Sequence, residues 1–196
     1  VPEQSRREAG REAVAEVVRR LNESRQPVVY AGVEIERFGL MPMLRKFVER
    51  TQLPVATSLM GKAVMPEHHA NFIGNYFGRL GPDPVRRYVE SSDCVLALGM
   101  LLTDMDTGVF TGRLDRRKLI QATSQGTTVS HHHYAEVTLP DLLRALLSTR
   151  TLRPHKFRPA PPPRPRPAPR RRAALQPHAL TVEGLIAELN EFLTPQ

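Results

Sequence analysis

One apolar run constrains the fold of this chain more than any other segment. Cys94–Leu98 is hydrophobic throughout and ends at Gly99, after which the sequence turns polar within a few residues. Pro27–Ala31 repeats the pattern and ends at Gly32. A short apolar run without alternation is typical of a parallel strand buried on both faces. Because parallel strands need crossover connections, usually helices that cover the sheet, the two runs predict an open α/β domain.

The rest of the sequence alternates between strand and helix patterns. We expect a Rossmann-like, mostly parallel sheet of about six strands, with helices on both faces and right-handed crossovers. The other strands are predicted at Leu53–Thr57, Phe72–Gly74, Lys118–Thr123 and Thr127–His131, with a further short one at Ala135–Val137. Apolar stripes predict helices over Ala9–Leu21 and Leu40–Arg50, and in segments that begin at Asp83 and Thr138.

A change in composition divides the chain into three parts. Residues 1–148 carry the α/β pattern and are expected to form one domain. Residues 149–178 hold eight prolines between Pro154 and Pro169, interleaved with arginines. Such a segment buries too little apolar surface to fold, so it is expected to be a disordered or polyproline II linker. Residues 179–196 contain an amphipathic helix at Leu180–Leu193, which is too short to be stable alone in water.

The net charge of +8 belongs to the linker and not to the domain. Nine basic residues and no acidic one lie between Arg150 and Arg172, so the remainder of the chain is close to neutral. Apart from Phe157, this stretch lacks the aromatic residues on which bases stack. We therefore expect no nucleic-acid partner and interpret the stretch as a solvated linker, with a ligand for an SH3-type groove as the alternative.

Few residues are suited to metal binding or nucleophilic catalysis. The single cysteine, Cys94, excludes an intrachain disulfide and any multi-cysteine zinc site, and it favours a reducing, cytoplasmic setting. In an extended segment, His131, His132 and His133 would point alternately to opposite faces, so they cannot share one ion. No apolar run approaches the roughly 20 residues that a membrane span needs. We expect no catalytic residue, no metal site and no membrane partner.

The loops that follow the strands are the best candidates for a ligand site. In open α/β sheets, ligands bind in a crevice outside the carboxyl ends of the strands. No G-x-G-x-x-G phosphate fingerprint accompanies these loops, so tight turns in a structural domain are the alternative. Lys62 could meet an anion or be solvated, and Asp104 could bind a cation or a ribose hydroxyl or bond its own backbone. The candidate crevice consists of Gly32, Val33, Thr57, Gly61, Lys62, Gly99, Leu102, Thr103 and Asp104.

Several segments, taken in order and spacing, resemble a known family. Arg25–Leu147 is similar to the central domain of thiamine-diphosphate-dependent 2-oxo acid decarboxylases, in particular the indolepyruvate and phenylpyruvate branch. The resemblance is carried by Pro27–Glu34, Arg37–Gly39, Pro54–Lys62, Phe72–Tyr76, Ser92–Gly99, Leu101–Asp104 and Thr107–Gly108. Leu180–Leu193 is similar to the helix that opens the family's carboxy-terminal domain.

The resemblance implies a non-catalytic region of a larger enzyme. Thiamine diphosphate and Mg²⁺ would be held by flanking domains, through a glutamate in the first and a Gly-Asp-Gly stretch in the third, and neither feature is in this sequence. The parent would be a homo-oligomeric carboxy-lyase, and this chain would supply scaffold, domain contacts and an effector crevice. The alternative is a stand-alone module that binds FAD, ADP or NAD in the crevice at Gly32, Thr57 and Gly99. A sirtuin-like deacylase shares this fold but needs four zinc-binding cysteines.

Overall fold

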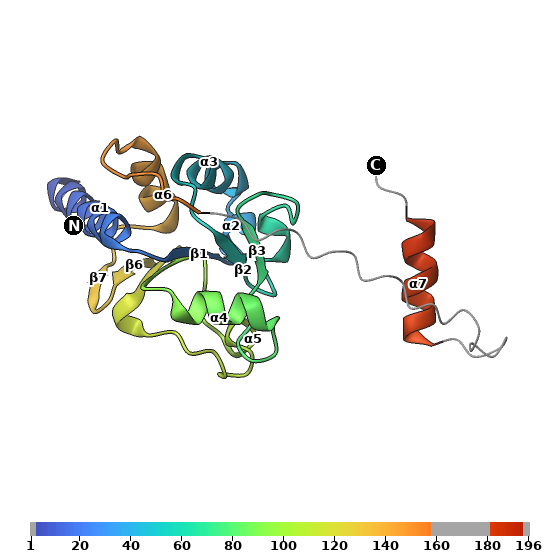
Figure 1. Cartoon of the computed structure of the whole chain (residues 1–196). Helices are drawn as coiled ribbons and strands as arrows, with labels where there is room; N and C mark the ends of the chain where they lie inside the picture. Colours follow the sequence, from blue (N-terminus) through green and yellow to red (C-terminus); the bar gives the residue numbers. More distant parts are fainter. Residues whose placement is uncertain (1–2, 158–180, 194–196) are drawn as a thin grey trace. The chain divides into compact units, whose positions relative to one another are not determined.

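A computed structural model describes residues 3–157 and 181–193 of the chain (Figure 1). The chain divides into two compact units, Val1–Pro159 and Ala160–Gln196. The first holds a sheet and six helices among its described residues, and the second contributes α7 (Val182–Phe192). Most of the predicted linker, residues 158–178, lies outside the described residues. No helix in the described segments is both long and apolar enough to cross a bilayer.

Seven strands form one sheet in the order β3-β2-β1-β4-β5-β6-β7. The first five strands along the chain run parallel to one another, and β6 and β7 are antiparallel additions at one edge. The predicted Rossmann-like, mostly parallel α/β fold is confirmed, with one strand more than the six expected. The strands are β1 (Pro27–Ala31), β2 (Val55–Thr57), β3 (Phe72–Asn75), β4 (Cys94–Leu98), β5 (Leu119–Thr123), β6 (Gly126–Val129) and β7 (His132–Tyr134).

The antiparallel edge differs from the sequence prediction. A single strand was expected over Thr127–His131, but β6 ends at Val129 and the chain reverses at Ser130, which has a φ of 55°. The strand expected at Ala135–Val137 lies instead at His132–Tyr134. Serine seldom adopts a positive φ and gives no turn signal as strong as Asn-Gly, so the pattern did not reveal this hairpin.

Helices cover both faces of the sheet (Figure 1). One face carries α1, α3 and α6, and the other carries α4. Two single-turn helices, α2 and α5, follow β1 and β4. The helices are α1 (Glu3–Glu23), α2 (Glu34–Arg37), α3 (Met41–Thr51), α4 (Asp83–Ser91), α5 (Asp104–Thr107) and α6 (Leu139–Ser148), with 3₁₀ turns at Lys62–Val64 and Arg116–Lys118.

The central strands separate two apolar cores. Along β1, Val29 packs with the α1, α3 and α6 side, whereas Val28 and Tyr30 pack with the α4 side. In β4, Leu96 and Ala97 divide between the same two cores. Every residue of both strands is buried, which explains why their sequences show no alternation.

The segment after α6 lies across the amino edge of the sheet. Asn22 binds it twice, donating to the carbonyl of Thr151 at 2.9 Å and accepting from the amide of Arg153 at 2.9 Å. The amide of His155 donates to the carbonyl of Thr51 at 2.7 Å, and the ring of Phe157 contacts that of Tyr88 on α4 edge-to-face. The packed domain therefore continues to Phe157, nine residues beyond the boundary at 148 that composition suggested.

Shortening a buried side chain of β4 should cost much of the domain's stability. Leu96 is completely buried, so Leu96→Ala should lower the free energy of unfolding by about 2–5 kcal/mol through lost burial and an unfilled cavity. Leu80→Ala, at a residue that is 65% exposed, is the matched control and should change it by less than about 0.5 kcal/mol. Urea denaturation followed by circular dichroism measures both, and equal effects would contradict the assigned core.

Candidate functional site

The strand order reverses between β1 and β4. β1 pairs with β2 on one side and with β4 on the other. The chain leaves β1 toward α2 and leaves β4 toward α5. Such a switch point is where open α/β sheets hold their ligands. The structure places Gly32 and Gly99, the two residues that ended the apolar runs, together at this point.

Three glycines of the predicted crevice pack backbone against backbone. A Cβ on Gly32 would overlap the carbonyl oxygen of Gly99, and one on Gly61 would lie 2.9 Å from the carbonyl carbon of Gly32. Gly99 also has a φ of 68°, which side-chain-bearing residues rarely adopt. The glycines therefore allow the exits of β1, β2 and β4 to approach one another, and this contact occupies the space between them.

The amides at this point are already hydrogen-bonded within the chain. The amide of Gly32 donates to the carbonyl of Leu98 at 2.8 Å, that of Glu34 to Gly99 at 3.3 Å, and that of Gly99 to Ala122 at 2.8 Å. A phosphate bound at a strand–helix junction needs free amides that point toward it. These three are not available for that role.

A buried carboxylate adds negative charge beside the switch point. Glu34 is 5% exposed, and its two oxygens accept from the hydroxyl of Ser124 at 2.7 Å and from its amide at 3.0 Å. Its Cβ is also the nearest atom that a side chain on Gly99 would meet, at 3.0 Å. A diphosphate here would meet a fixed anion instead of a cation, so these residues do not fit one.

The remaining candidates near β2 bond to neighbours. The hydroxyl of Thr57 contacts the side-chain oxygen of Asn75 at 2.7 Å. Lys62 is exposed and forms an ion pair with Glu67 at 3.5 Å. Val33 is the residue before α2 and makes no side-chain cap.

After β4, the candidates organise their own loop. Leu102 has a φ of 52°, and the hydroxyl of Thr103 caps α5 by accepting from the amide of Asp106. The Asp104 carboxylate accepts from the next amide, that of Met105, at 2.8 Å. These contacts match the alternative in which loop carboxylates bond their own backbone.

A tyrosine that the sequence pattern did not single out fixes this loop to the sheet. The hydroxyl of Tyr30, on β1, donates to the carbonyls of Asp106 at 2.7 Å and Tyr76 at 3.1 Å. Its ring meets that of Tyr76 edge-to-face at 5.2 Å. Burial, with the nearby Asp106 and Tyr76, raises the pKa of Tyr30 well above its usual range. The signal in the sequence was a tyrosine inside a fully buried strand, because a buried hydroxyl needs a partner.

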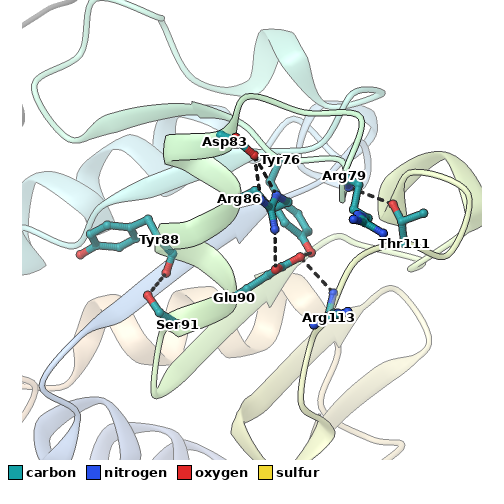
Figure 2. A network of polar contacts seen from close by, with 9 residues as sticks. All are labelled: Tyr76, Arg79, Asp83, Arg86, Tyr88, Glu90, Ser91, Thr111 and Arg113. Atoms are coloured by element: carbon teal, nitrogen blue, oxygen red, sulfur yellow. Dashed lines mark hydrogen bonds and ion pairs between the residues drawn. The ribbon is translucent and has the colours of Figure 1, made fainter.

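A second tyrosine extends this anchor to α4 (Figure 2). The hydroxyl of Tyr76 donates to Glu90 at 3.2 Å, and the same carboxylate oxygen accepts from the amide of Arg113 at 3.1 Å. Arg86 lies between Glu90 and Asp83 and forms ion pairs at 3.5 Å and 2.7 Å. The polar residues of α4 thereby hold the far end of the loop that follows β4.

Two surface hollows lie away from the carboxyl edge. One, of about 800 Å³, runs between α1 and α6 and is lined mainly by apolar atoms, with Val14 and Ala145 among its residues. The other, of about 350 Å³, is polar and lies at the amino end of β4, beside Asp93. Neither includes a residue of the predicted crevice.

Other reactive side chains are dispersed. Among the residues that the structure describes, no three His, Cys, Asp or Glu side chains are grouped to hold a metal ion. His132 contacts the ring of Tyr134, while His133 bonds to the hydroxyl of Thr128 at 2.9 Å. Cys94 is buried, and desolvation raises the pKa of its thiol to about 12.

Comparisons with known proteins show one family and several proteins to which this chain is similar. The family described as "Thiamine pyrophosphate enzyme, central domain" matches residues 14–149. An indole-3-pyruvate decarboxylase of Azospirillum brasilense is 31% identical over 150 residues, which cover 72% of this chain and 28% of that protein. A pyruvate decarboxylase of Candida albicans is 31% identical over 158 residues, covering 80% of this chain and 28% of that protein. The chain spans about a quarter to a third of the length of the curated relatives it matches.

Adding one methyl group should distinguish the packed glycine from a free one. Gly32→Ala should destabilise the domain by about 1–3 kcal/mol or more, because its Cβ would overlap the carbonyl of Gly99. Gly10→Ala is the control: Gly10 lies in α1 with open space around it, so alanine should stabilise by about 0.5–1 kcal/mol. Thermal and urea unfolding report both, and a neutral Gly32→Ala would contradict the glycine contact.

The buried thiol of Cys94 should be unreactive in the folded protein. Because the pKa of Cys94 is raised by burial, Ellman's reagent at pH 8 should label it at least 100-fold more slowly in the native chain than in urea. A folded-state pKa above the unfolded one favours folding at low pH, so this contribution should be lost as the pH rises from about 8.5 toward 12. Rapid labelling of the native chain would place Cys94 outside the core.

Proposed function

This chain belongs to the thiamine pyrophosphate enzymes as a central domain, and from that membership we propose that it is the non-catalytic middle region of a 2-oxo acid decarboxylase. The parent would depend on thiamine diphosphate and Mg²⁺ and act on indolepyruvate, phenylpyruvate or pyruvate. The observation that carries the proposal is the family match over residues 14–149, together with decarboxylases of 31% identity.

The structure supports an enzyme in which other domains hold the cofactor. When bound, thiamine diphosphate supplies the electron sink for loss of CO₂. The switch point between β1 and β4 does not fit the diphosphate, because the amides of Gly32, Glu34 and Gly99 are engaged and Glu34 places a negative charge there. We assign cofactor and metal binding to flanking domains of the same enzyme.

Within such an enzyme, this region would be a rigid spacer with specific contacts. Our proposed organisation is a domain over residues 1–148 with packing contacts that continue to Phe157, a linker within 149–178, and a helix over 179–196 that opens the next domain. The parent would be a homo-oligomer. The predicted crevice residues would then position loops that contact other domains or an effector.

The alternative is a stand-alone module that binds FAD, ADP or NAD at Gly32, Thr57 and Gly99. The strand order at the switch point is compatible with it. The engaged amides and the Glu34–Ser124 contact weigh against it, because they leave no phosphate-binding surface between the two glycines.

The purified chain should bind none of these nucleotides. Isothermal titration with FAD, ADP and NAD should give no saturable heat at millimolar ligand, because the amides that would hold the diphosphate are occupied. Saturable binding that is lost in Gly32→Ala would establish the alternative. Gly10→Ala serves as the folded control variant.

The chain should not decarboxylate by itself. With thiamine diphosphate, Mg²⁺ and indolepyruvate, phenylpyruvate or pyruvate, a coupled alcohol dehydrogenase assay should show no turnover above the protein-free rate. The product of the complete native reading frame should show turnover in the same assay. Activity of the isolated chain, or a complete reading frame that encodes no further domain, would overturn the proposal.

A further inference from the structure

The exposed apolar side chains of the first unit gather at one edge of the sheet. Among its described residues, nine large hydrophobic side chains are exposed, and all lie in loops or helix starts at the carboxyl ends of β1 to β4. We call this surface the apolar edge. It consists of Phe38, Met41, Leu59, Met60, Leu80, Leu101, Met105, Val109 and Phe110. At the amino edge, by contrast, residues 151–157 pack against Asn22 and Tyr88.

The most exposed part of the apolar edge has a strained backbone. Val109 and Phe110 are 66% and 75% exposed, and both have positive φ values, 55° and 58°. A β-branched residue such as Val109 is disfavoured in this region, and two such residues in succession are rarer still. The strain gives nothing to the domain's own core, because both side chains point to solvent. Strain of this kind tends to collect at functional surfaces.

The fold holds these two residues in place from several sides. The amide of Val109 donates to the carbonyl of Asp104 at 2.7 Å, and that of Gly112 donates to Thr107 at 2.9 Å. Tyr30 binds the loop before them. Glu90 binds the loop after them with the support of Tyr76 (Figure 2). The loop is therefore preformed and does not need to be ordered by a partner.

Two cations lie beside this loop. Arg79 and Arg113 are exposed, and their backbone amides bind Thr111 and Glu90 (Figure 2). Their guanidinium groups make no hydrogen bond or ion pair within the part of the chain that the structure describes. A surface that fits the apolar edge would thus be apolar at its centre and carry carboxylates at its rim.

We propose that the apolar edge is a docking surface for the other domains of the same decarboxylase polypeptide, with Phe110 as its anchor. This rests on the proposed function. Three observations favour that occupant over a second copy or a membrane. The relatives carry two thirds or more of their length outside the matched region. The edge involves loops that follow four parallel strands, so all of them lie at the same end of the sheet. Its exposed cations, Arg37, Lys62, Arg79 and Arg113, lie after four different strands, and Lys62 is paired with Glu67, whereas a membrane-binding basic patch takes four to eight clustered Lys or Arg.

The test compares the full-length gene product with the 196-residue chain. Chymotrypsin cleavage after Phe110 and amide exchange over residues 101–113 should both be at least tenfold slower in the full-length protein. Phe110→Asp should return the exchange of residues 101–106 to the rate of the isolated chain. Ala70→Asp adds the same charge at an exposed apolar residue near the amino end of β3, and it should change nothing.

Tyr76→Phe tests the docking role without altering the docking surface. It removes the hydrogen bond to Glu90 but keeps the ring, so the domain should remain folded while cleavage after Phe110 in the full-length protein rises several-fold. Equal protection of the loop in both proteins, in an active full-length enzyme, would overturn the docking inference and leave the proposed function standing. An inactive product that ends at Gln196 would overturn both. Protection that appears in the isolated chain only as it dimerises in sedimentation equilibrium would assign the edge to a second copy.

Discussion

The contact between Gly32 and Gly99 is the constraint on which the carboxyl edge depends. It brings the ends of β1 and β4 so close that the amide of one strand exit bonds to the last carbonyl of the neighbouring strand. In a nucleotide-binding sheet, glycines at these positions make room for a ligand's phosphates. Here the same glycines make room for the protein's own backbone. The crevice that the strand order creates is thereby filled from within.

Glu34 reinforces that outcome. A buried carboxylate is costly unless its oxygens are hydrogen-bonded, and Ser124 satisfies both of them from the end of β5. The contact joins the exits of two strands that lie on either side of β4 in the sheet. A residue that closes the site to anions therefore also ties the sheet together.

The sequence was most informative for strands that are buried on both faces, because successive residues of such a strand are apolar without alternation. Runs such as Cys94–Leu98 and Pro27–Ala31 could only be central strands, and the α/β class followed from them. It was least informative where one side chain decides the course of the backbone, as at Ser130, whose positive φ splits a predicted strand into a hairpin. The segment after residue 148 packs through Leu152, Phe157 and the backbone amides of Arg153 and His155, and these contacts are not visible in a composition dominated by proline and arginine. The candidate residues lie at the carboxyl edge of the sheet, but their hydrogen-bond partners depend on tertiary contacts that spacing does not encode.

The tyrosine hydroxyls show why the loop after β4 can carry strain. α5 is a single turn, so most of its carbonyls have no partner within the helix. Tyr30, on a central strand of the sheet, donates a hydrogen bond to one of these carbonyls, that of Asp106. At the other end of the loop, Glu90 accepts hydrogen bonds from the hydroxyl of Tyr76 and from the amide of Arg113. A loop held at both ends by hydrogen bonds, of which the one from Tyr30 is buried, cannot relax Val109 and Phe110 without breaking those bonds. The polar groups buried beneath the loop thus determine which apolar groups it presents above.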